Sequence, residues 1–396
     1  MSNFTDFISG GGDAAPIPTA QFVIGESKTF TAPMTGRIKV IITGGGGQGA
    51  FLANQNATPN ANAGSGTGGG AGGYSEKTFA VTAGETFTVT VGAGGSSALA
   101  VNDINSSRVG NDGSNTTFVT DSAAVSVNMA ANGGGGGQYG AATSSAITVA
   151  GGTGGTASGG DFNYTGGAGG SITRVANNAN SAMTTGGGAV ALYGTTYRGG
   201  NVTLSTANAS SYMIGSTGGA GVGGNGGDIT FSGTGSNARF SGGGSASRSG
   251  SSGESGSSLT TTIIQGEVPG APMTSATISV IDAQGFAYGG SYNYNASPAI
   301  STSGFGGGGG GATGYNQTNS QYLYSYAGTA GGFGGGGGCT YVSGVDYLAT
   351  GQVRAGPGGV GGGGSGAYSG PFHTMTSATN RSWAAAGDGL CIIMYI

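Results

Sequence analysis

Few residues of this chain of 396 belong to the types that carry out chemistry. His373 is the single histidine, so a histidine-based triad would need it, and no Gly-x-Ser-x-Gly motif in a strand–helix context accompanies it. The carboxylates are widely spaced, which disfavours a glycosidase pair. Cys339 and Cys391 are interpreted as small buried residues, and whether they pair stays open. We expect a protein that is not an enzyme.

Two glycine motifs resemble ligand sites, and neither is complete. Gly44-x-Gly46-x-x-Gly49 follows a predicted strand, as a dinucleotide fingerprint does, but no acidic residue for a ribose appears before Glu76. Residues 223–228 approach a calcium-binding repeat, but no tandem copy follows them. We expect neither a cofactor nor a metal.

Aromatic residues are more informative, because they gather late in the chain. Ten of the 17 tyrosines lie between residues 288 and 368, in segments that we expect to be loops between glycine runs. Tyrosine beside Ser, Gly and Asn is typical of recognition loops, although these side chains could equally cover the ends of a scaffold. The receptor-binding candidates are Tyr292, Tyr294, Tyr315, Tyr322, Tyr324, Tyr326, Tyr341, Tyr347, Tyr368, Phe372 and Trp383.

These aromatic residues need a scaffold that positions them, and glycine dominates the rest of the sequence. The chain has 95 glycines, mostly in contiguous runs, with 7% charged residues and a net charge of −4. Low net charge argues against disorder, and contiguous runs with 9 prolines argue against collagen. Basic residues are few and scattered, so nucleic-acid binding is not expected. The sequence shows neither a signal peptide nor a long apolar stretch, so we do not expect membrane insertion.

Period-two alternation predicts β-strands between residues 21 and 130. The clearest segments are 36–43, 74–81, 86–91 and 124–129, with a hairpin turn at Ala83-Gly84. The last segment, 389–396, is apolar on both faces. It should therefore insert beside the N-terminal strands and close their sheet.

The glycine runs have no side chains to bury, so their backbone groups must bond to neighbouring runs. An extended helix with three residues per turn, polyglycine II, suits this arrangement. We expect an all-β protein in three parts: an anchoring peptide and linker (1–20), a discontinuous β-sandwich (21–130 with 389–396), and a polyglycine bundle with long polar loops (131–388). Phe4, Phe7 and Ile8 are the anchoring candidates.

Several of these segments together resemble a known family. They are Thr-Phe-Thr-Ala-Pro at 29–33, the strand and glycines of 38–49, Gly-Gly-Ala-Gly-Gly-Tyr at 69–74, residues 81–95 and the closing 387–395. This pattern resembles the glycine-rich domain of bacteriophage tail-fibre and appendage proteins. The middle of the chain is similar in layout to the tip adhesins of T-even-type phages, whose polyglycine helices form a sandwich.

The resemblance implies a virion protein, made in the host cytoplasm, that recognises the host surface through loops on a glycine scaffold. Its receptor would be a cell-surface glycan or an outer-membrane protein. Its N-terminal region would bind tail, tail-fibre or capsid proteins, and a monomer and a homotrimer both stay open. Two alternatives remain: a structural fibre or decoration protein with no receptor of its own, and an ice-binding glycine bundle.

Overall fold

The computed structural model describes an all-β protein. The described residues are 20–53, 64–96, 107–121, 126–140, 145–174, 181–192, 194–204, 213–221, 224–231, 238–241, 312–316, 326–327, 331, 334–337, 340–344, 353–354, 358–369, 381–382 and 385–396. Every regular element within these ranges is a β-strand. The expected fold class is confirmed.

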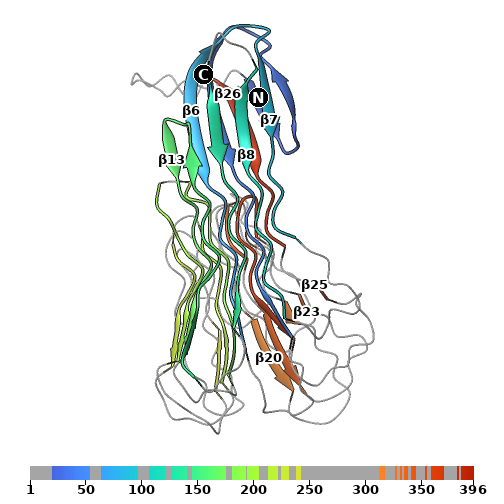
Figure 1. Ribbon diagram of the computed structural model, residues 1–396, viewed down its shortest axis with the longest axis vertical. Helices are drawn as coiled ribbons and strands as arrows, with labels where there is room; N and C mark the ends of the chain where they lie inside the picture. Colours follow the sequence, from blue (N-terminus) through green and yellow to red (C-terminus); the bar gives the residue numbers. More distant parts are fainter. Residues whose placement is uncertain are drawn as a thin grey trace, which may run out of the picture.

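Two five-stranded antiparallel sheets form one end of the molecule (Figure 1). Sheet A comprises, in spatial order, β1 (Ala20–Ile24), β26 (Leu390–Tyr395), β3 (Gly36–Thr43), β6 (Tyr74–Val81) and β13 (Phe162–Tyr164). Sheet B comprises β12 (Ala157–Ser158), β9 (Asn128–Ala131), β8 (Thr116–Thr120), β7 (Thr86–Thr90) and β2 (Lys28–Thr31). Their facing residues build one apolar core, in which the rings of Phe87 and Phe118 stack 4.9 Å apart.

The C-terminal strand closes sheet A, as the sequence predicts. β26 lies between β1 and β3 and pairs antiparallel with both. Cys391, Ile393 and Tyr395 are buried in the core, whereas the alternate residues of β26 are only half-buried. One sheet therefore joins the two ends of the described chain.

Two local expectations need correction. The strand expected at 124–129 begins only at Asn128, although Val127 and Met129 are buried as the alternation requires. The turn at Ala83-Gly84 exists, with Gly84 at a φ of 87°, but it is not a hairpin turn. It joins β6 of sheet A to β7 of sheet B, so the two flanking strands do not pair with each other.

Below the sandwich, glycine segments run side by side and bond through their backbones (Figure 1). The segment 44–51 shows the pattern. The N–H groups of Gly44, Gly47 and Ala50 donate to the segment 67–73, and those of Gly45, Gln48 and Phe51 donate to the segment 108–114. The N–H of Gly46 donates to Gly387, in a third neighbour.

The direction of donation thus repeats every three residues. The segment 67–73 behaves in the same way, since Thr67, Gly70 and Gly73 all donate to the segment 132–138. A helix with three residues per turn would give this period. Polyglycine II itself stays a prediction for these segments.

The segments are so close that side chains do not fit between them. A Cβ atom at Gly70 would overlap the carbonyl group of Thr153, and one at Gly363 would overlap that of Gly69. At Gly25, in a loop of the sandwich, a Cβ would meet nothing within 4 Å. Glycine is therefore a steric requirement in the bundle.

Contacts in the bundle cross the expected division at residue 131. Gly134 donates to Gly45, and Gly70 donates to Gly135. β12 and β13, which follow residue 131 in sequence, belong to the two sandwich sheets. The expected domain boundaries stay a prediction. The described residues before and after residue 131 bond to one another and are not spatially separate.

Four small sheets lie at the other end of the bundle. Sheet C comprises β11 (Ile147–Val149), β14 (Ile172–Arg174), β16 (Val202–Leu204) and β18 (Ile229–Phe231). Sheet D comprises β10 (Tyr139–Gly140), β5 (Ser65–Gly66), β15 (Ser181–Thr184), β17 (Met213–Ser216) and β19 (Ala238–Ser241). Sheet E comprises β20 (Ala312–Asn316), β22 (Thr340–Gly344), β24 (Ala367–Ser369) and β4 (Phe51–Ala53). Sheet F comprises β21 (Tyr326–Ala327), β23 (Val353–Arg354) and β25 (Arg381–Ser382).

These small sheets arise from a repeated unit. From β14 to β19 the chain alternates between sheets C and D, and from β20 to β25 it alternates between sheets E and F. From β14 onward, successive strands of each of these sheets pair in parallel. Each unit extends the sheets that its predecessor began, which is how repeat proteins bury what one unit cannot bury alone.

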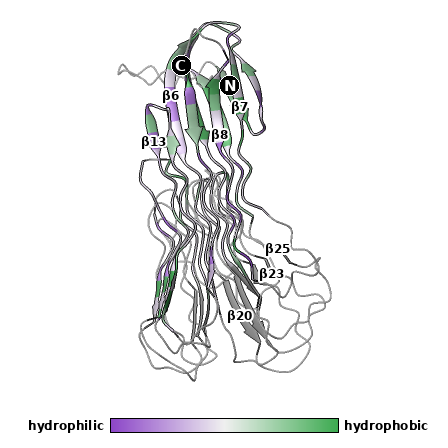
Figure 2. Ribbon diagram, in the orientation of Figure 1, coloured by the Kyte–Doolittle hydropathy of each residue, from purple (hydrophilic) through white to green (hydrophobic). Residues whose placement is uncertain are grey.

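Hydrophobic residues gather at both ends of the molecule, and the glycine segments between them are almost uncoloured in Figure 2. The smaller apolar cluster joins sheets C and D through Ile172, Met183, Val202, Leu204 and Ile229. Two side-chain cores therefore bracket a bundle that has almost no side chains.

Candidate functional site

The structure places four receptor-binding candidates in strands, where loops were expected. Tyr315 lies in β20, Tyr326 in β21, Tyr341 in β22 and Tyr368 in β24. The loop assignment of these four residues is therefore wrong. The candidates Tyr292, Tyr294, Tyr322, Tyr324, Tyr347, Phe372 and Trp383 lie outside the described residues, as do Phe4, Phe7, Ile8, Cys339 and His373.

Two of these tyrosines are register partners in sheet E. The register aligns Thr313, Tyr341, Tyr368 and Leu52 on four neighbouring strands. Tyr315 follows Thr313 by two residues in β20. Sheet F lies next to sheet E, with β21 and β23 close to β22. The tyrosines thus belong to a regular stack of strands.

The ends of these strands are the more promising place for recognition. β20, β22 and β24 are parallel, so their carboxyl ends meet at one edge of sheet E. From that edge the chain leads into residues 317–325, 345–352 and 370–380 on its way to sheet F. In sequence these three segments carry Tyr322, Tyr324, Tyr347 and Phe372.

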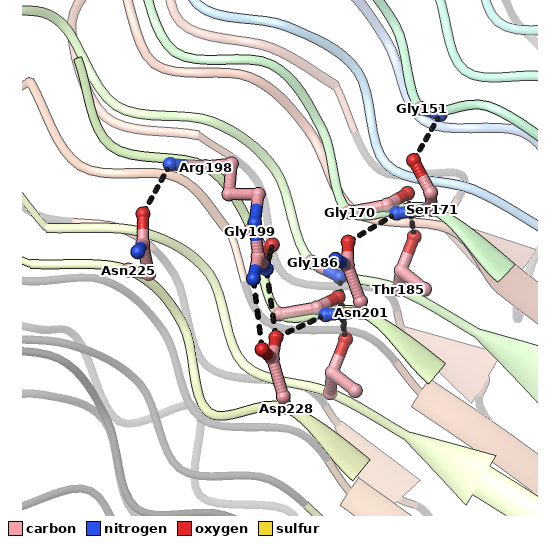
Figure 3. A network of polar contacts seen from close by, with 12 residues as sticks. Gly151, Gly170, Ser171, Thr185, Gly186, Arg198, Gly199, Asn201, Asn225 and Asp228 are labelled. Carbon is pink, nitrogen blue, oxygen red and sulfur yellow. Dashed lines mark hydrogen bonds and ion pairs between the residues drawn. The ribbon is translucent and has the colours of Figure 1, made fainter. Parts of the chain in front are cut away.

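A polar network joins the glycine segments to sheets C and D (Figure 3). Arg198 donates from both terminal nitrogens to the carboxylate of Asp228, over 2.7 and 2.8 Å. The backbone N–H of Asn201 also donates to Asp228, over 2.7 Å. The side chain of Asn225 accepts from the N–H of Arg198. Residues on two successive repeats are thereby fastened together.

The ionisation of this pair is stabilised by its hydrogen bonds. The bond to Asp228 raises the pKa of Arg198 against the effect of burial. Burial alone would raise the pKa of Asp228, but the bonds from Arg198 and from the Asn201 N–H outweigh it and lower that pKa. Asp228 ends the segment that resembles a calcium-binding repeat, and its carboxylate is committed to Arg198 and Asn201.

Three buried threonines complete the network, each inserted into a ladder between glycine segments. Thr185 accepts from the Gly68 N–H over 3.0 Å and donates to the Gly170 carbonyl over 2.6 Å. Thr217 links the Gly186 N–H to the Gly200 carbonyl in the same way. Thr67 accepts from the Gln138 N–H and donates to the Ala150 carbonyl.

Each hydroxyl group links two glycine segments at a position where the period of three calls for a hydrogen bond but the two backbones form no direct one. Ala71 donates directly to Gly167, and three residues earlier Gly68 reaches Gly170 only through Thr185. The same relation holds between Ala189 and Gly186, where Thr217 supplies the link. Sequence analysis missed these threonines, although a Thr-Gly-Gly triplet begins at all three positions.

The buried guanidinium group of Arg174 was also missed, whereas the burial of Cys391 was expected. Arg174 is 1% exposed in β14, and burial lowers its pKa. Cys391 is a free thiol in the sandwich core, where burial raises its pKa to about 12. A thiol of this kind is unreactive at neutral pH. In the described part of the chain no group of three His, Cys, Asp or Glu side chains could hold a metal ion.

The fold defines an all-β protein whose sheets are held apart by a glycine scaffold. The family model of the glycine-rich domain matches residues 22–258, and the chain belongs to that family. The match begins within β1 and covers the other sandwich strands except β26, together with the repeats of sheets C and D. No curated protein matches the sequence. Among the described residues no helix has the length and apolar character needed to span a membrane.

Proposed function

We propose that this protein is a virion-attached adhesin of a bacteriophage, carried on a tail fibre or a related appendage. It binds a glycan or an outer-membrane protein on the host cell, and it performs no catalysis. Its N-terminal region, with the sandwich end, attaches to other virion proteins. The protein is made in the host cytoplasm and ends on the surface of the virion.

One observation carries the proposal: the parallel strands β20, β22 and β24, which the aromatic-rich segments follow in sequence, end at a single edge of sheet E, at the opposite end of the bundle from the sandwich (Figure 1). A rigid spacer with different elements at its two ends suits a protein that holds a particle at one end and a receptor at the other. The bundle supplies that rigidity through lateral backbone bonds.

Binding would be non-covalent. Tyrosine combines a large, rigid apolar surface with a hydroxyl group, so it can pack on a sugar face or on a protein and also form hydrogen bonds.

The test replaces aromatic residues without disturbing the sheets. A deletion of 315–327 would remove part of β20 and all of β21, so the sharper variant is Tyr322→Ser with Tyr324→Ser. We expect binding to host cells to fall at least about tenfold, as loss of aromatic anchors does in other interfaces. The matched control is Tyr212→Ser, which lies in the segment between β16 and β17 of the other stack and should bind as the parent does.

Two results would contradict the adhesin. In the first, the purified parent protein neither binds host cells nor competes with infection. In the second, the protein is present at many copies on the capsid and particles without it adsorb normally, which would favour the decoration protein. Equal loss of binding in Tyr212→Ser would contradict the choice of segments but not the adhesin.

A further inference from the structure

The face of sheet A that points away from the sandwich core carries an apolar patch. Val23, Ile392 and Ile41 are direct cross-strand neighbours on β1, β26 and β3. Val23 is 59% exposed, and the two isoleucines are partly exposed. Leu390 and Met394 lie on the same face of β26 and are also partly exposed. These five residues are the outer patch.

The outer patch is bounded on two sides. Toward β6, Lys39 and Glu76 form an ion pair of 2.6 Å. Toward the glycine bundle, Ile41 packs against a cluster that contains Val190 and Leu192. Toward the edge of the sheet there is no boundary, because no described strand pairs with the free side of β1.

We propose that residues 1–19 of the same chain cover the outer patch, with Phe4, Phe7 and Ile8 seated on it. This segment joins the sheet at Ala20, the first residue of the edge strand on which the patch begins. It places three large apolar side chains within five residues, at positions 4, 7 and 8. The inference concerns the isolated chain and does not depend on the proposed function.

The length of the segment fits this role. Residues 9–19 separate Ile8 from β1, and eleven residues reach at most about 35–40 Å. The patch extends over three strands, which is about 10 Å across. A tether of this length also gives an effective concentration near millimolar, which a second copy of the chain or a separate partner would have to exceed.

Limited chymotrypsin digestion of the full chain tests the proposal, with release of peptides 1–4 and 1–7 followed by mass spectrometry. Val23→Lys puts a charge at the exposed edge of the patch and should speed both cleavages about tenfold, because cleavage follows the population of the undocked segment. Phe162→Ser is the matched control. It alters another exposed apolar residue, 54% exposed, at the opposite edge of sheet A and should leave the rates unchanged.

A melting curve shows that each variant is folded before digestion. Equal rates in the parent and Val23→Lys would overturn the proposal, because the segment then does not use the patch. Parent rates that rise on dilution would also overturn it, since a second copy would then be the occupant. An independent variant, with Phe4, Phe7 and Ile8 all changed to Ser, should increase the fluorescence of the apolar dye ANS, and unchanged fluorescence would count against the proposal.

Discussion

The sandwich and the glycine bundle are stabilised by opposite means. In the sandwich, apolar side chains from two sheets fill one core, and the ring pairs around Phe87 are its centre. In the bundle, backbone N–H and C=O groups bond between segments, and at the glycine positions there is no space for a Cβ. The sandwich therefore depends on which side chains are present, whereas the bundle depends on their absence.

This difference sets how each region responds to substitution. A core tolerates exchange of one apolar residue for another of similar volume, because burial is not directional. A backbone-bonded bundle tolerates no such exchange, since even one methyl group would push apart two segments that share hydrogen bonds. Four predictions test the contrast.

The largest effect is expected from Gly70→Ala. The new Cβ would overlap the carbonyl group of Thr153, and backbone on both sides limits its escape. We expect a loss of at least about 5 kcal/mol, which is exceptional for one methyl group. Gly25→Ala is the control, because nothing lies within 4 Å of that position. Denaturant unfolding measures both, and similar midpoints would show that the bundle is not close-packed.

Phe118→Ala tests the sandwich in the conventional way. The ring is fully buried and stacks on Phe87. Removing it should cost about 3–5 kcal/mol in unfolding free energy. Phe118→Leu should recover more than half of that loss, and a recovery of this kind has no counterpart at Gly70. If Phe118→Leu were as damaging as Phe118→Ala, the two regions would not differ as described.

Thr185→Val separates the hydroxyl link from the volume of the side chain. The change leaves the Gly68 N–H and the Gly170 carbonyl without the partner that joins them. Two unsatisfied buried groups should cost about 2–4 kcal/mol. Thr173→Val, at an exposed position of β14, is the control and should be nearly neutral. An equally small effect at Thr185 would mean that its hydroxyl is not a structural link.

The smallest effect concerns pH. The folded-state pKa of Asp228 is lowered, so its contribution is complete above the pKa of the unfolded chain and is lost as the pH falls through the folded pKa, below about 4. The carboxylate side chain is 43% exposed, which limits the effect to less than about 1 kcal/mol. Asp228→Asn should flatten the acid limb of a plot of stability against pH. If the acid limb were unchanged in Asp228→Asn, other carboxylates would be responsible for the loss of stability at low pH.

Sequence reasoning succeeded where side chains carry the information. The alternation in 36–43 and 74–81 predicts β3 and β6 at their observed bounds. The apolar closing segment predicts the insertion of β26. β8 was not predicted, although Thr116 and Phe118 alternate with residues that are less buried.

Prediction failed where the backbone carries the information. A glycine in 44–47 gives no sign that its partners lie near residues 70, 114 and 387, because glycines are identical in sequence. The strands of sheets C to F have two to five residues, too few for alternation to be visible, and their parallel partners are distant in sequence. This explains why Tyr341 and Tyr368 were assigned to loops although they are neighbours in one sheet.

The central claim is that the glycine segments are as firmly ordered as the sandwich, and amide hydrogen exchange measures this most directly. We expect the amides of residues 67–73 to exchange as slowly as those of β3, because each bonds to a neighbouring segment. Exchange of 67–73 at the rate of an unfolded chain, with β3 still protected, would contradict it.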